Sequence, residues 1–187
     1  DVWSYQRYLE IAAQYAHVVE AFGLEVGDRL AVQGQNSPEA LATYAACLQA
    51  GVIFLPLNTA YTAREMAYFI ENSGAKLVLC DTKAETALRP VAQAAQAQLQ
   101  VLNGDGSGGF THLAMQHPKS FQTRARSGND LAAFLYTSGT TGRSKGAMLS
   151  HDNLLSNAKT LCEAWRFTAQ DVLLHALPIF HTHGLFV

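Results

Sequence analysis

Helix-like and strand-like segments alternate along residues 4–102, and few protein architectures are compatible with that order. Helix caps mark several boundaries: Ser4, Ser37 and Thr62 are suitable N-caps, and Gly51 and Gly74 are suitable helix ends. We expect helices over about residues 4–22, 37–50, 62–74 and 83–98, and strands over 29–33, 52–57, 76–80 and 100–102. A repeated strand–helix order predicts an α/β fold of mostly parallel sheets with helices on both faces.

The segment pattern also suggests how the chain divides. Residues 1–116 are predicted to form a first α/β subdomain, with a glycine-rich surface loop at 103–109. Residues 117–130 are polar and read as a linker. An apolar strand at 131–136 then begins a second α/β subdomain, which we place at 131–187.

Composition excludes several classes of protein. Apolar residues make up 49% of the 187 residues, which rules out a disordered chain, and charged residues only 15%, against about 25% in a typical domain. So little charge is expected where part of the surface is covered by further protein. With thirteen basic and fifteen acidic residues and no basic cluster, nucleic-acid binding is not expected. No apolar run reaches the roughly 18–20 residues of a membrane span.

The cysteines point to a reducing compartment. Cys47, Cys80 and Cys162 are odd in number, far apart, and set in apolar or helical surroundings. We interpret them as buried thiols and not as a disulfide framework or a zinc site. A cytoplasmic protein is therefore the expectation.

One segment is rich in groups that bind phosphate. After the strand at 131–136, glycines let backbone N–H groups converge, hydroxyls add donors and a lysine adds positive charge. The chain then resumes a strand-like run at 147–149. We predict a polyphosphate-binding loop made by Thr137, Ser138, Gly139, Thr140, Thr141, Gly142, Ser144 and Lys145.

Other interpretations of these patterns are weaker. A plain solvated hairpin rarely contains so many hydroxyls and a lysine. The match of 142–146 to a serine-hydrolase nucleophile elbow lacks the helix that must follow the serine. The Walker A spacing is absent, and the G-x-G-x-x-G match at 104–109 is followed by too few residues for a crossover helix.

The segment Tyr136–Gly146 resembles the phosphate-binding signature of the adenylate-forming superfamily, which includes acyl-CoA synthetases, luciferases and the adenylation domains of peptide synthetases. Ser144 departs from that signature, where proline is the usual residue. Leu177–Gly184 resembles a second signature of the family, and Gly51–Asn58 resembles the strand that leads into an early loop. In combined detail the chain is most similar to the malonyl-CoA synthetases of this superfamily.

The resemblance implies an AMP-forming acid–CoA ligase. A carboxylate, by this likeness malonate, would attack ATP to give acyl-AMP and pyrophosphate, and coenzyme A would then displace AMP; Mg²⁺ would accompany ATP. The chain would be the N-terminal part of the large domain of a longer enzyme, itself incomplete at its N-terminus. Its partner would be the remainder of the same enzyme chain, and the isolated 187 residues are not expected to make acyl-CoA.

Two histidines in the second signature carry the implied acid site. His181 takes the family position between the ATP and acyl sites, so we assign it as a catalytic and substrate-binding residue. His183 is a second candidate for binding a carboxylate. A structural role remains open for each. A metal pair is not expected, because no suitably spaced carboxylates accompany them. His151 is expected at a helix start and His175 in a strand.

Two alternatives stay open. In the first, the chain is a non-catalytic nucleotide- or phosphate-binding fragment. In the second, it is part of a ligase for another short acid or for a fatty acid.

Overall fold

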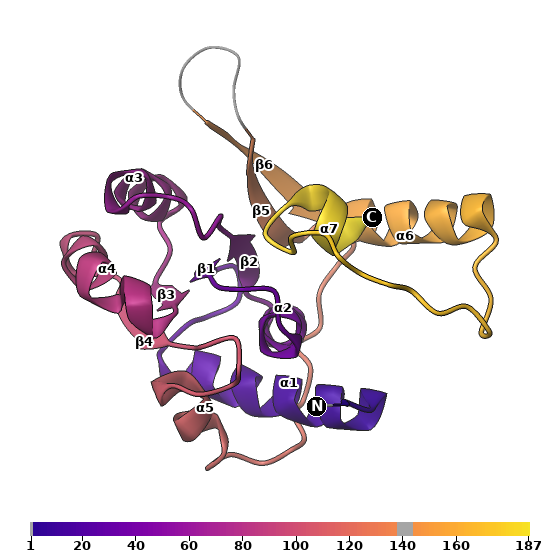
Figure 1. Ribbon diagram of the computed structural model, residues 1–187, viewed down its shortest axis with the longest axis horizontal. Coiled ribbons are helices and arrows are strands. Elements are labelled where there is room, and N and C mark those ends of the chain that lie inside the picture. Colours follow the sequence, from indigo (N-terminus) through magenta and orange to yellow (C-terminus); the bar gives the residue numbers. More distant parts are fainter. Residues whose placement is uncertain (1, 138–143) are drawn as a thin grey trace.

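The structure is a computed structural model that describes residues 2–137 and 144–187. Its described part contains a six-stranded sheet in the order β4-β3-β1-β2-β5-β6 (Figure 1). Neighbouring strands are parallel except for the last pair, β5 and β6, which is antiparallel. The strands are β1 (Arg29–Gln33), β2 (Ile53–Pro56), β3 (Leu77–Cys80), β4 (Gln98–Val101), β5 (Leu131–Thr137) and β6 (Lys145–Ser150).

Helices cover both faces of the parallel part of the sheet, which confirms the predicted fold class. One face carries α1 (Tyr5–Ala21), α2 (Pro38–Ala50) and α5 (Gly109–Ala114). The other carries α3 (Ala63–Ser73) and α4 (Thr82–Ala94). The chain continues past β6 with α6 (His151–Trp165) and α7 (Thr182–Phe186).

Two hydrophobic cores lie on the two sides of the sheet. Along β1, Leu30 and Val32 belong to the core beneath α1 and α2, whereas Ala31 between them belongs to the core beneath α3 and α4. This alternation is the period-2 geometry of a strand buried on both faces. It explains why the strands read as continuous apolar runs.

The predicted caps are present. Ser37 accepts a hydrogen bond from the Ala40 N–H at 3.1 Å, and Thr62 forms a reciprocal capping box with Glu65. Gly51 and Gly74 end α2 and α3 in the left-handed conformation, with φ of 71° and 62°. The boundaries of these helices therefore lie where the sequence predicts them.

Three predictions about secondary structure and burial are wrong. The helix expected over 83–98 ends at Ala94, because the backbone from Gln98 onward pairs with β3 and begins β4. His175 lies in an irregular segment and not in a strand. Cys162 is exposed, since α6 buries none of its residues, whereas Cys47 and Cys80 are buried as expected.

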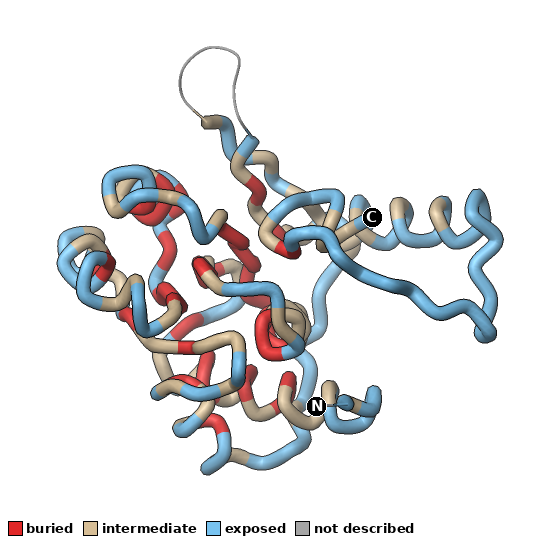
Figure 2. Tube along the Cα trace, in the orientation of Figure 1, coloured by how far each residue is buried: buried red, intermediate tan, exposed pale blue. Residues whose placement is uncertain are grey.

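Burial is uneven along the chain. Figure 2 shows buried residues concentrated among α1 to α4 and the central strands, while α6 and residues 166–178 after it are exposed or half-buried. Val172 and Leu174 are 95% and 92% exposed. In the part of the chain that the structure describes, no helix is both long and apolar enough to cross a membrane.

Candidate functional site

The base of the predicted phosphate loop is the end of the β5–β6 hairpin. Thr137 and Lys145 are paired across the two strands, and the Thr137 hydroxyl donates to the Lys145 carbonyl oxygen at 3.4 Å. The Lys145 side chain is exposed. Of the other predicted loop residues, Ser144 is described, while Ser138, Gly139, Thr140, Thr141 and Gly142 lie outside the described residues.

An aromatic cluster on one face of the sheet supports this base. The Tyr68 hydroxyl, from α3, donates to the Ser144 carbonyl oxygen at 3.0 Å. The Tyr136 hydroxyl donates to Asn72 Oδ1 at 2.7 Å, and the Tyr136 ring lies 4.5 Å from that of Phe69, centre to centre. One strand residue, Tyr136, and helix α3 therefore hold the backbone next to Lys145.

Two further features show how closely the hairpin packs. A Cβ on Gly146 would collide with the Phe134 ring, so glycine is needed where the two strands meet. Partial burial, with a smaller contribution from Tyr68, raises the pKa of Tyr136 to about 12, so this tyrosine stays neutral at ordinary pH. It acts as a hydrogen-bond donor in the support of the loop.

The second predicted segment, Leu177–Gly184, is attached to the loop that follows β1. Asn36 Nδ2 donates to the Leu177 carbonyl oxygen, and Asn36 Oδ1 accepts from the Ile179 N–H, both at 2.9 Å. Ile179 is buried. Asn36 therefore fixes this segment at the carboxyl edge of the sheet, the edge from which the β5–β6 loop also leaves.

The structure places the two candidate histidines differently. His181 is the exposed N-cap of α7, and its Nδ1 accepts from the His183 N–H at 3.4 Å. His183 lines a cavity of about 470 Å³ between α7, the end of α6 and the segment 173–177, whereas His181 does not. Among the described residues, no hydrogen bond joins either histidine to Thr137, Ser144 or Lys145.

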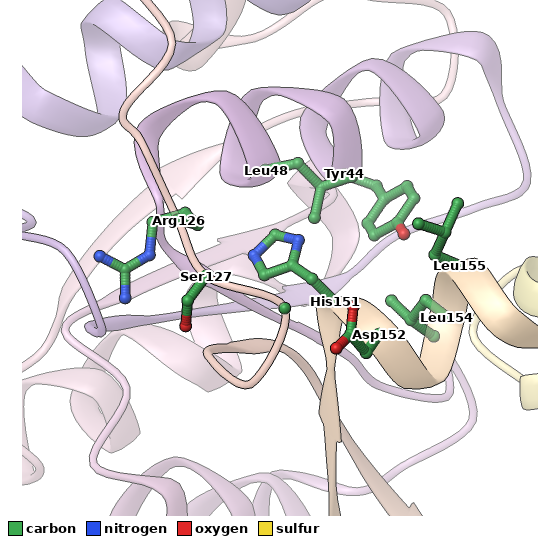
Figure 3. A pocket seen from close by; sticks show the side chains of 9 residues that line it. Tyr44, Leu48, Arg126, Ser127, His151, Asp152, Leu154 and Leu155 are labelled. Carbon is green, nitrogen blue, oxygen red and sulfur yellow. The ribbon is translucent and has the colours of Figure 1, made fainter.

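Another cavity lies away from these segments, at the amino end of β5. It measures about 530 Å³ and opens between α2, the turn at 126–128 and the start of α6 (Figure 3). Its lining includes Tyr44 and Arg126, with His151 at the start of α6 as predicted. At about 3.3 Å per residue, the seven-residue β5 separates this cavity from the phosphate loop by roughly 20 Å. We do not assign the predicted chemistry to it.

Sequence reasoning missed both residues that hold the predicted segments, Tyr68 and Asn36. Tyr68 is one aromatic residue on the expected third helix, and Asn36 lies between the expected strand at 29–33 and the Ser37 cap. Their hydrogen-bond partners lie 76 and at least 141 residues away. Only three-dimensional contact identifies them.

Comparison with known proteins defines the class. The family model of AMP-binding enzymes matches residues 1–187, and the chain belongs to this family. The match confirms the resemblance to adenylate-forming enzymes drawn from the two signature segments.

Individual members of the family show which enzymes this chain resembles in sequence and structure. The apo crystal structure of MatB from Rhodopseudomonas palustris is 51% identical, with a TM-score of 0.96 over all of this chain and 37% of that chain. ATP-bound MatB from the same organism is 52% identical, with the same TM-score and coverage. A malonate–CoA ligase from Arabidopsis thaliana is 29% identical over 169 residues, which are 89% of this chain and 28% of the relative. The chain thus spans about a third of the length of these relatives.

Proposed function

We propose that this chain is part of an AMP-forming acid–CoA ligase that activates malonate. The observation that carries the proposal is the β5–β6 hairpin, which presents Lys145 and the Thr137 hydroxyl at the carboxyl end of β5 on an aromatic support. The likeness to ATP-bound MatB and to a malonate–CoA ligase supports both the nucleotide and the acid. Coenzyme A is the proposed acceptor, and the remainder of the enzyme chain the proposed partner.

The proposed chemistry joins two anions and expels a third. The acid carboxylate attacks the α-phosphate of ATP, pyrophosphate leaves, and the thiol of coenzyme A then displaces AMP to give the thioester. Such a reaction depends on positioning and on neutralising negative charge. Lys145 and the hydroxyl of Thr137 would bind the β- and γ-phosphates, and His181 and His183 would face the acid.

Mg²⁺ is the metal proposed for this reaction, as a companion of ATP. No group of three or more histidine, cysteine, aspartate or glutamate side chains suited to a metal ion is found within residues 2–137 and 144–187. We assign Mg²⁺ no ligand in this chain. The buried thiols of Cys47 and Cys80 support a cytoplasmic location.

The test is ATP–pyrophosphate exchange by the full-length ligase, with malonate, methylmalonate, acetate, ferulate and a long fatty acid compared. Malonate is expected to give the highest kcat/KM. Exchange with acetate but not with malonate would overturn the assignment of the acid, and ferulate belongs in the set because feruloyl-CoA synthases of Amycolatopsis and Streptomyces are 34% identical.

The phosphate loop is tested by one substitution and a matched control. Lys145→Ala is expected to lower exchange by roughly a hundredfold, the scale for removing one charged group from an anionic transition state. Lys83→Ala removes an exposed lysine from α4 and should leave exchange unchanged. Equal activities of the two variants would contradict the proposed role of the loop.

A further inference from the structure

The side chain of Asn36 binds a backbone segment that is remote in sequence. Its Nδ2 donates to the carbonyl oxygen of Leu177 and its Oδ1 accepts from the N–H of Ile179, each at 2.9 Å and across 141 and 143 residues. An amide side chain carries an NH2 donor group and a carbonyl acceptor, the same kinds of group that a peptide unit offers. Asn36 therefore binds the segment as a neighbouring strand would.

Backbone hydrogen bonds connect the residues held by Asn36 to His181. The His181 N–H donates to the Pro178 carbonyl oxygen at 3.1 Å, and the Leu185 N–H donates to the His181 carbonyl oxygen at 3.0 Å. Gly184 lies so close to the Pro178 carbonyl that a Cβ would collide with it. Ile179, only 7% exposed, anchors the turn between them. The location of His181 thus depends on where Asn36 holds residues 177–179.

The place of Asn36 in the fold suits this task. It follows β1, and the loops after β1 and β2 lead to α2 on one face and α3 on the other. Ligands of open α/β sheets bind at the carboxyl edge where the chain departs to opposite faces. There the loop after β2 is held in turn by Gln33, whose Nε2 donates to the carbonyl oxygens of Asn58 and Tyr61 at 3.1 and 3.0 Å.

We infer that Asn36 is a positioning residue that holds Leu177–Gly184, and through it His181, at the carboxyl edge of the sheet on which the phosphate loop stands. The inference deepens the proposed function and rests on it for its catalytic consequence. Its structural half, that Asn36 orders the segment, stands on the contacts above.

Two substitutions separate the parts of the contact. Asn36→Ala removes both hydrogen bonds. Asn36→Asp keeps an acceptor for the Ile179 N–H but sets a carboxylate oxygen against the Leu177 carbonyl, so it should be at least as harmful. The matched control is Asn103→Ala, because Asn103 also bridges two segments, with bonds to Thr82 and Ser107 at 2.9 to 3.1 Å, but at the β4 end of the sheet.

The first measurement is amide hydrogen exchange in the full-length ligase. Asn36→Ala is expected to speed exchange of the amides of residues 179–185 by roughly tenfold, the effect of losing one or two net hydrogen bonds. Asn103→Ala should leave these amides unchanged and loosen residues 103–107 instead. Unchanged exchange at 179–185 in Asn36→Ala would overturn the inference.

The second measurement is malonate-dependent pyrophosphate exchange, with the His181→Ala background included. We expect Asn36→Ala to lower kcat by roughly tenfold to a hundredfold, the cost of about 1 Å of misplacement, with little change in the KM for ATP. In the His181→Ala background the further loss should be less than threefold, because the two residues act as one unit. Independent, multiplying losses, or full activity of Asn36→Ala, would overturn the positioning role.

The two measurements keep the inference apart from the proposed function. A wild-type ligase that exchanges pyrophosphate with none of the acids would contradict the proposed function. The amide exchange would then still support or overturn the ordering of residues 177–184 by Asn36.

Discussion

At the scale of single residues, burial decides the chemistry of the cysteines. Complete burial raises the pKa of the Cys47 thiol, and burial together with the carboxylates of Asp81 and Glu85 raises that of Cys80 to about 12. Cys162 lies exposed on α6. The chain therefore has two thiols that the fold keeps neutral and one that is accessible.

This difference predicts how stability depends on pH. In the unfolded chain a thiol ionises at about pH 9, whereas burial keeps the Cys47 thiol protonated in the fold. Above that pH, the free energy of unfolding therefore falls by about 1.4 kcal/mol per pH unit. The contribution of Cys47 is complete below pH 9 and is lost as pH rises toward its folded pKa. The free energy of unfolding, from urea denaturation at pH 8 and pH 10.5, should fall less in Cys47→Ala than in the wild type. Cys162→Ala should show the wild-type slope, and identical slopes for all three proteins would refute the assignment.

At the scale of elements, local signals predicted most helices and missed what joins them. The helix ends are predictable from sequence where a cap acts on residues only a few positions away, as at Ser37, Thr62, Gly51 and Gly74. The end of α4 is not predictable in this way, because it depends on the pairing of Gln98 with β3, which makes Gln98 part of β4. In the candidate site, Lys145 and Thr137 are predicted from the composition of their loop. Tyr68 and Asn36 were missed, because their roles arise from contacts across the fold.

The β5–β6 hairpin is the element whose packing can be tested most directly. Gly146→Ala places a methyl group against the Phe134 ring, which also packs against the Tyr136 ring at 5.3 Å between ring centres. Overpacking of this kind costs about 1–3 kcal/mol, and the strand carrying Lys145 should shift with it. We expect a lower midpoint in urea denaturation and a raised KM for ATP.

The matched control for this substitution is Gly34→Ala. A Cβ on Gly34 would make only an ordinary 3.6 Å contact with Val32, and the change should leave both stability and the KM for ATP near wild-type values. A Gly146→Ala protein as stable and as active as Gly34→Ala would show that the hairpin tolerates the methyl group.

At the scale of the whole molecule, the low charge and the uneven burial agree. Charged residues make up 15% of the sequence, and the largest apolar exposure follows β6, where α6 buries no residue and Val172 and Leu174 are almost fully exposed. The front part of the chain, by contrast, has a core on each side of its sheet. Exposed apolar area of this extent is typical of a surface that other protein covers. In the proposed ligase, that cover is the remainder of the enzyme chain.

This leads to a prediction for the 187-residue chain produced by itself. It should bind a hydrophobic dye such as ANS and self-associate, since α6 and residues 171–177 present leucine, valine and tryptophan side chains to water. It should also form no malonyl-CoA from malonate, ATP and coenzyme A, because it spans only 37% of the MatB chain that it resembles. Leu174→Lys together with Val172→Lys should reduce dye binding and self-association in the isolated chain. In the full-length ligase the same pair should be destabilising, because there the two side chains are covered. Thioester formation by the isolated chain, or a full-length protein indifferent to the two lysines, would show that this surface is complete without further protein.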